Sequence, residues 1–319
     1  MQFWVNPLGI DLKYKLIKKY KKIAMKIFDC SLYYDEDLIL ETRLNILDKF
    51  VNKFVICESK FTHSGEKKRL NFNIKKFSSF KNKIIYLVND TEPKNLIYNK
   101  DKEERSDQMR PNAMKRIAYQ REFLKNGLHE ANTNDLILYS DNDDIPDPKN
   151  LNEDLLKERI SIFEQKLFYY KFNLLYEKLL WYGTRACRKK DLPKFEILRL
   201  IKAKKYPFYR IDTFIKDNKR MDVQVIKNGG WHFTRVISPE EIHKKELIAE
   251  HHDEYKLSKK NPQKIADLIK RRVIDHNHFV DSKQDKYGKE FKLKQIPLSD
   301  LPNYISNNIE KYRNFLDLE

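Results

Sequence analysis

Short apolar runs alternate with longer amphipathic stretches over the first half of the chain. Residues 38–50 and 112–127 repeat apolar positions at helical spacing, and the second stretch ends at Gly127. Helices that separate strands predict parallel pairing with right-handed crossovers. The pattern therefore predicts an α/β fold around a central sheet. Its expected strands are residues 25–30, 53–58, 84–88 and 135–140.

The second half of the chain has a less regular pattern. A strand-length apolar run at residues 223–226 precedes a tight turn at Gly229 and Gly230. No internal repeat or low-complexity linker divides the chain. We predict one folded domain over residues 25–280, a basic extension over residues 1–24, and a Lys-rich extension over residues 281–319 with a docked helix. Further helices are expected at residues 151–163, 239–257, 262–274 and 298–316.

Composition adds charge to this picture. A chain of 319 residues with 40% hydrophobic residues can fill a packed core. Its 64 Lys and Arg exceed its 47 Asp and Glu, for a net charge of +17. Such an excess is typical of proteins that bind nucleic acid, anionic membranes or phosphorylated ligands, but a solvated Lys-rich surface explains it equally. Three widely spaced cysteines exclude a disulfide framework and favour a reducing compartment.

The N-terminal segment is basic and amphipathic. Residues 12–20 place apolar side chains at helical spacing among lysines. Such a helix suits either an anionic membrane surface or packing on the domain. The chain has neither the run of about eighteen apolar residues that a membrane span needs nor a secretion signal. We therefore expect a cytoplasmic protein, with peripheral contact at the inner face of the membrane as an added hypothesis.

Carboxylates crowd the end of the fourth expected strand. Asp141, Asp143, Asp144 and Asp147 follow residues 135–140 directly. Ligands of open α/β sheets bind beyond the carboxyl ends of strands. Crowded carboxylates repel one another unless a cation neutralises them, and their oxygens suit Mg²⁺ or Mn²⁺. The cluster predicts a divalent metal that binds a diphosphate, with a solvated acidic turn as the alternative.

Sequence blocks over about residues 25–258 resemble glycosyltransferase family 17, whose best-known members add the bisecting β-1,4-linked N-acetylglucosamine to N-glycans. The most specific blocks are Ser-Asp-Asn-Asp-Asp-Ile-Pro at residues 140–146 and Gly-Gly-Trp-His-Phe at residues 229–233. Asp144 and Glu122 depart from the family, which usually has Glu and Asn there. The other blocks are residues 26–30, 40–44, 55–59, 61–65, 119–121, 127–128, 168–170, 181–183 and 252–255.

The resemblance implies a GT-A type nucleotide-sugar-binding fold, with a mixed, mainly parallel central sheet flanked by helices. It also implies an inverting transfer from a UDP-sugar with Mn²⁺ or Mg²⁺, and N-acetylglucosamine is the sugar we expect. The acceptor is expected to be a glycan or a lipid-linked glycan. No nucleic-acid partner is expected under this hypothesis.

Residue roles follow from placing this chemistry on the matching positions. An inverting transfer needs a carboxylate base near the acceptor hydroxyl. Asp222 is preferred over Asp212 and Glu254, because it precedes the strand-length run 223–226. Metal ligands are expected at Asp141, Asp143 and His232, donor contacts at Glu58, Gln120, Arg121, Asp141 and Trp231, and catalytic roles at Asp222, Glu254 and Asp144.

Two other classes of function remain open at this stage. In a nucleic-acid or polyanion-binding protein, the lysines with interleaved Tyr and Phe would form the functional surface. A metal-dependent phosphoesterase also uses clustered carboxylates. The latter is less favoured, because the sequence near the cluster lacks the additional His and Asp ligands that such sites need.

Overall fold

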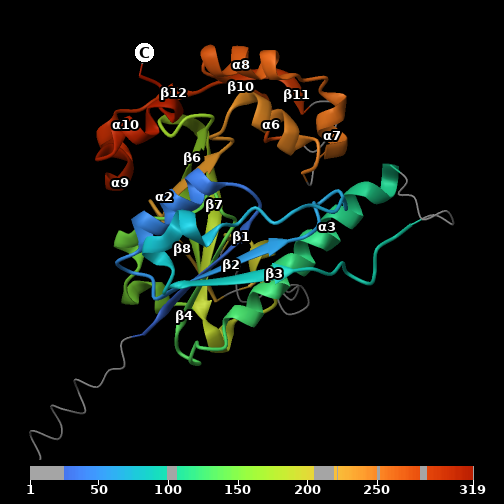
Figure 1. Cartoon of the computed structure of the whole chain (residues 1–319). Coiled ribbons are helices and arrows are strands. Elements are labelled where there is room, and N and C mark those ends of the chain that lie inside the picture. Colours follow the sequence, from blue (N-terminus) through green and yellow to red (C-terminus); the bar gives the residue numbers. More distant parts are fainter. Residues whose placement is uncertain are drawn as a thin grey trace, which may run out of the picture.

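The computed structural model describes residues 25–98, 106–204, 219–220, 222–249, 252–280 and 286–318. Within these residues, ten strands form one mixed sheet, and most of their pairings are parallel. The path through the sheet is β3-β2-β1-β4-β7-β6-β9-β5, with β8 beside β6 and β12 beside β7. Helices flank this sheet (Figure 1). The predicted α/β class is confirmed, and the arrangement is consistent with a GT-A-like fold.

The first half of the chain forms the predicted parallel unit. Its strands are β1 (Ile27–Tyr33), β2 (Lys53–Ser59), β3 (Ile84–Asn89) and β4 (Leu136–Ser140). All of their mutual pairs are parallel. The predicted helices are confirmed as α2 (Asp37–Leu47) and α3 (Ser106–Phe123), which continues into the 3₁₀ turn η2 (Leu124–Gly127). The strands are nearly continuously apolar because both of their faces are covered.

Alternate strand residues pack against helices on opposite faces of the sheet. Phe28 and Val55 belong to a buried cluster with Leu124, on the side of α3 and η2. Phe54 belongs to another cluster with Leu44, on the side of α2. Because successive side chains of a strand point to opposite faces, this alternation fixes the register of each strand.

Residues 151–163 do not form the expected helix. They contain a short 3₁₀ turn, η4 (Glu153–Leu156), and the start of the long strand β6 (Ile160–Tyr169). β6 pairs with β7 (Leu174–Arg188), β8 (Val223–Ile226) and β9 (Gly230–Thr234). These neighbours satisfy its backbone and bury its apolar residues, which outweighs a local helical spacing.

The remaining strands and helices complete the second half. The run at residues 223–226 is confirmed as β8. The pattern at residues 239–257 resolves into two helices, and the pattern at residues 262–274 is a helix that ends early and continues as a strand. The elements are β5 (Asp144–Pro146), α4 (Phe195–Leu200), α6 (Pro239–Glu246), α7 (His252–Leu257), α8 (Pro262–Lys270), β10 (Val273–His276), β11 (Tyr287–Lys292) and β12 (Lys294–Gln295).

The C-terminal segment packs on the sheet through two short helices. The single helix expected at residues 298–316 is instead α9 (Asn303–Ser306) and α10 (Ile309–Tyr312). Ile305 and Tyr312 share a buried cluster with Ile145 of β5. The hydroxyl groups of Tyr312 and Thr42 are hydrogen-bonded at 2.8 Å, which joins α10 to α2. The domain boundaries at residues 24 and 280 remain predictions.

The amphipathic segment at residues 12–20 and Asp212 lie outside the described residues. Among the described helices, none combines the length and the apolar character that crossing a membrane would require.

Candidate active site

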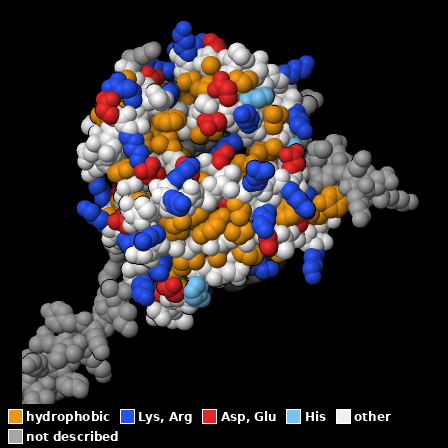
Figure 2. Space-filling view, viewed as in Figure 1, with side chains coloured by type: hydrophobic (Ala, Val, Ile, Leu, Met, Phe, Trp, Pro, Cys, Tyr) orange, Lys and Arg blue, Asp and Glu red, His pale blue; other side chains and the backbone are white. Residues whose placement is uncertain are grey.

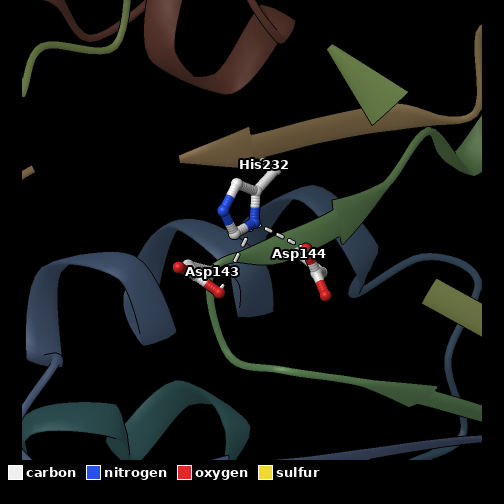
Figure 3. A group of neighbouring side chains, drawn as sticks. All are labelled: Asp143, Asp144 and His232. Carbon is white, nitrogen blue, oxygen red and sulfur yellow. Dashed lines mark hydrogen bonds and ion pairs between the residues drawn. The ribbon is translucent and has the colours of Figure 1, made fainter. Parts of the chain in front are cut away.

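The loop after β4 and the short strand β5 bring two predicted residues next to a third from far along the chain. β5 pairs antiparallel with β9, and this register sets Asp144 opposite His232. Asp143 lies just before the strand and turns toward the same imidazole (Figure 3). One ligand atom from each of Asp143, Asp144 and His232 lies within 4.8 Å of the others. We call these residues the Asp-Asp-His group.

The electrostatics of this group favour a bound cation. Nδ1 of His232 lies 2.7 Å from Oδ1 of Asp144 and 3.6 Å from Oδ1 of Asp143. Burial and the carboxylates of Asp144 and Asp141 raise the pKa of Asp143 to about 7, although His232 acts to lower it. Burial would lower the pKa of His232, but Asp143 and Asp144 outweigh it and raise that pKa.

One oxygen of this group has no partner. Oδ2 of Asp144 is buried and accepts no hydrogen bond from the described residues. A buried, unsatisfied carboxylate oxygen is costly unless a ligand or an ion completes it. Carboxylate and imidazole ligands suit a divalent metal ion. The group could therefore hold such an ion, and its donor set does not identify the metal.

Neighbouring strands hold the group in place. The indole of Trp181 stacks on the imidazole of His232, with ring centroids 4.4 Å apart and planes at 18°. A Cβ atom at Gly183 would overlap with side-chain oxygens of Gln165 and Asp144, so this position of β7 has room only for glycine. Trp181 and Gly183 belong to one of the sequence blocks described above. In the structure, both residues of this block pack against the Asp-Asp-His group.

A buried ion pair supports the backbone of Asp144. Arg43 of α2 donates to the carbonyl oxygen of Asp144 at 2.5 Å. The same guanidinium binds both carboxylate oxygens of Asp29, at 2.6 and 2.5 Å. Both side chains are almost completely buried. Such two-pronged pairs fix geometry as well as charge, so Arg43 anchors the start of β5.

Asp141 lies near the group but is bound by other residues. Its carboxylate accepts hydrogen bonds from Arg199 at 3.0 Å, from Tyr139 at 3.0 Å and from Arg121 at 3.4 Å. Burial acts to raise the pKa of Asp141, but Arg199 and Arg121 together lower it well below its usual range. The structure therefore joins Asp144, rather than Asp141, to Asp143 and His232. The metal and donor roles of Asp141 remain predictions.

Arg199 was not expected from the sequence. It belongs to α4, which has no recognisable motif, and it reaches Asp141 only through the fold. Arg121 also pairs with Glu196 of α4 at 2.8 Å, which brings α4 against α3. The only local sign of Arg199 in the sequence was a basic residue within the short amphipathic stretch 195–200.

Two small hollows lie beside the loop after β4. The first, of about 210 Å³, is lined in part by Arg121, Gln120 and Asp141. The amide of Gln120 also donates to the carbonyl of Cys57 at 3.1 Å. The second hollow, of about 160 Å³, is lined in part by Asp143 and Glu246. Glu36 and Asn142 line both hollows, so the loop after β4 lies between them.

Two predicted donor residues have other surroundings. Glu58 is buried at the end of β2, and its oxygens accept hydrogen bonds from Tyr86, Lys68 and the backbone amides of Asn71 and Phe72. These hydrogen bonds anchor the loop that follows β2.

Trp231 precedes His232 in β9 and so points to the opposite face. It lines a separate cavity of about 670 Å³. The donor-binding roles of Glu58 and Trp231 remain predictions.

Of the predicted bases, Asp222 lies away from the group. Asp222 accepts two hydrogen bonds from Arg220, each of 2.8 Å, and these lower its pKa. Its carbonyl accepts from Ile160 at the start of β6, whereas His232 pairs with Leu167 near the end of that strand. At about 3.3 Å per residue, the distance along β6 from Ile160 to Leu167 is roughly 23 Å. Glu254 lies in α7, and its side chain is outside the described residues.

Comparison with known proteins identifies the family. Residues 14–190 match glycosyltransferase family 17. Because the match spans more than half of the chain, the chain belongs to this family and is a glycosyltransferase. The family implies a nucleotide-sugar donor and a glycan acceptor. The matched range contains Asp143 and Asp144 but ends before His232.

Two further comparisons do not identify the activity of the chain. A search of curated proteins finds no match. A solved structure titled "Crystal Structure of a Mycobacterial Protein" is 11% identical, and the similarity covers 90% of this chain and 89% of that chain at a TM-score of 0.33. A similarity at this level supports no conclusion about function.

Proposed function

We propose that this glycosyltransferase is inverting and metal-dependent, and that it transfers N-acetylglucosamine from a UDP-sugar to a hydroxyl of a glycan or lipid-linked glycan. The main support is the Asp-Asp-His group, in which Oδ2 of Asp144 is buried and has no hydrogen-bond partner among the described residues. The group follows the carboxyl end of β4, and ligands of open α/β sheets bind at such ends. The sugar and the acceptor rest on the resemblance to the bisecting enzymes.

Asp143, Asp144 and His232 would hold the metal, Mn²⁺ or Mg²⁺. When bound, such an ion supplies positive charge that stabilises the diphosphate leaving group. Arg121 and Arg199 supply further charge, since both surround Asp141 beside the group. We propose that the donor diphosphate takes over hydrogen bonds that these guanidinium groups now give to Asp141.

The acceptor is proposed to enter the hollow lined by Asp143 and Glu246. In an inverting transfer the acceptor oxygen bonds to C1 of the sugar while the bond from C1 to the diphosphate oxygen breaks. A carboxylate takes the hydroxyl proton. We propose Glu246 for this role ahead of Asp222, because Glu246 lines the hollow beside Asp143. Arg235, at 2.6 Å, would orient its carboxylate.

The first test is calorimetric titration with UDP-N-acetylglucosamine, UDP-glucose, UDP-galactose and GDP-mannose. Each titration is run with Mn²⁺, without metal, and on Asp143→Ala, with Asp90→Ala at an exposed position as the control. We expect metal-dependent binding of UDP-N-acetylglucosamine that is lost in Asp143→Ala and kept in the control. Binding that is equal with and without metal would overturn the metal dependence, and preference for another donor would overturn the sugar.

We further propose a cytoplasmic location with peripheral contact at an anionic membrane through residues 1–24. The basic amphipathic pattern at residues 12–20 is the only support. Flotation with liposomes that contain phosphatidylserine tests it, on the full chain and on a chain without residues 1–22. Equal flotation of both chains would contradict the proposal.

A further inference from the structure

We propose that the cavity of about 670 Å³ beside Trp231 is a second saccharide site, which binds an acidic oligosaccharide. This proposal goes beyond the transfer reaction, because the cavity lies away from the Asp-Asp-His group. Its volume falls in the range of about 300–1,000 Å³ that is typical of small-ligand sites.

Segments from across the chain build the walls of this cavity. They are the end of α2 with the turn that follows it, the turn after β5, Lys166 of β6, the turn before β9 with the start of that strand, and residues 299–304. The last segment and Trp231 lie outside the range that matches the family. The cavity therefore depends on a part of the chain that the family comparison does not cover.

The cavity offers aromatic surfaces of the kind that stack on sugar rings. Trp231 is partly buried, so its ring is supported by the protein and still reaches the cavity. Tyr304 lines the cavity as well, and Phe50 at its margin is 42% exposed. Aromatic faces bury the C–H faces of a sugar while leaving its hydroxyls free to form hydrogen bonds. Asn228 and Asn303 line the same space and supply amides for those hydroxyls.

Three lysines give the cavity an excess of positive charge. Lys49, Lys149 and Lys166 line it, and all three are exposed. Within the described residues, none of them forms an ion pair. Asp147 and Asp300 also line it, which leaves a net charge of about +1. Asp147 already accepts a hydrogen bond from the backbone of Lys149 at 3.0 Å. Exposed lysines beside aromatic rings favour a saccharide that carries carboxylate groups.

The geometry separates this cavity from the catalytic group. Trp231 and His232 are consecutive in β9, so their side chains lie on opposite faces of the sheet. Neither Asp143, Asp144 nor His232 is among the residues that line the cavity. An occupant of the cavity would thus contact the protein without touching the Asp-Asp-His group.

Calorimetric titration with trigalacturonic acid, and with maltotriose as the neutral counterpart, tests the proposal on the full chain. We expect trigalacturonic acid to bind without metal, and more weakly at higher salt. The double variant Lys149→Ala with Lys166→Ala should weaken this binding by about tenfold, as should Trp231→Ala. Lys157→Ala, at a position 68% exposed and outside the cavity, is the control and should bind normally.

Donor binding distinguishes this proposal from the proposed transfer. The double lysine variant should bind Mn²⁺ and UDP-sugar as the unchanged chain does, because neither lysine contacts the Asp-Asp-His group. If Trp231→Ala fails to fold, the lysine variant still decides the outcome. No binding of trigalacturonic acid, equal binding of maltotriose, or binding that the lysine variant leaves unchanged would overturn the proposal.

Discussion

Asp144 connects three parts of the chain, namely β5, β9 and α2. Its carboxylate contacts His232 of β9, and its backbone carbonyl accepts from Arg43 of α2. The side chain is completely buried, yet Oδ2 is unsatisfied within the described residues. A residue held this firmly can present a charge to a ligand without having to reorganise. Its position therefore suits a metal ligand, whereas the sequence led us to expect a catalytic role for this residue.

Replacement of this charge tests the metal site directly. Asp144→Asn keeps the size of the side chain and removes its negative charge, so we expect Mn²⁺ affinity to fall by more than about 100-fold, beyond the loss caused by residues that only orient a ligand. Titration followed by the paramagnetic signal of free Mn²⁺ measures this. Asp90→Asn, at an exposed position, is the matched control. An unchanged affinity in Asp144→Asn would exclude it as a ligand.

Metal binding should also depend on pH. The metal binds the carboxylate form of Asp143, whose pKa of about 7 means that a proton competes with the metal below neutral pH. The pKa of His232 is also raised, so a proton competes with the metal at the imidazole as well. We expect Mn²⁺ to bind at least about tenfold more weakly at pH 6 than at pH 8. Equal affinity at both values would show that neither group loses a proton on binding.

At the scale of elements, β5 and β9 create the site and β7 supports it. β7 runs antiparallel to both β4 and β6, and its middle passes beneath the Asp-Asp-His group. Gly183 leaves the space that the side chains of Gln165 and Asp144 fill. The same long-range pairing placed residues 160–163 in a strand, although the sequence pattern over residues 151–163 had predicted a helix.

Gly183→Ala should damage both stability and the site. The added methyl group overlaps with the oxygens of Gln165 and Asp144, and overpacking of this kind costs about 1–3 kcal/mol. Urea denaturation measures the free energy of unfolding, and Mn²⁺ titration measures the site. Leu180→Ala, which truncates a side chain of the same strand that is 49% exposed, should change neither by much. A fully stable Gly183→Ala with normal metal affinity would show that the strand can shift.

At the scale of the whole molecule, the C-terminal segment belongs to the main core. Tyr312 is completely buried and packs edge-on against Phe172, with ring centroids 5.2 Å apart. Its hydroxyl is hydrogen-bonded to that of Thr42. Residues near the end of the chain thus stabilise α2, which also anchors Asp144 through Arg43.

Truncation of this tyrosine tests that dependence. Tyr312→Ala should lower the free energy of unfolding by about 3–5 kcal/mol, the usual cost of removing a buried aromatic side chain. Tyr312→Phe should cost only about 1 kcal/mol, since it loses the hydrogen bond alone. Arg313→Ala, at a neighbouring position that is 59% exposed, serves as the control in the same thermal and urea unfolding experiments. A small effect of Tyr312→Ala would mean that the segment is dispensable.

The overall charge of +17 can be tested separately from the active site. In the view of Figure 2, basic side chains are interspersed with acidic ones rather than gathered in one patch. We therefore expect elution from heparin at moderate salt, with a shallow dependence of affinity on salt concentration. Tight and steeply salt-dependent binding, together with no nucleotide-sugar binding, would instead favour the polyanion hypothesis.

The sequence by itself determined the parallel strands and helices of the first half, and the carboxylate cluster after β4. These features are local, because periodicity and the order of neighbouring residues specify them. The motif blocks likewise identified the family, which the match over residues 14–190 confirmed.

Only the tertiary structure decided which residues meet. Asp144 and His232 are 88 positions apart, and Asp141 and Arg199 are 58 positions apart. No local pattern records such contacts, because strand pairing across the sheet creates them. The same pairing left Asp222 at the far end of β6 from His232. The sequence could name most residues of the site, but the register of β5 against β9 determined their partners.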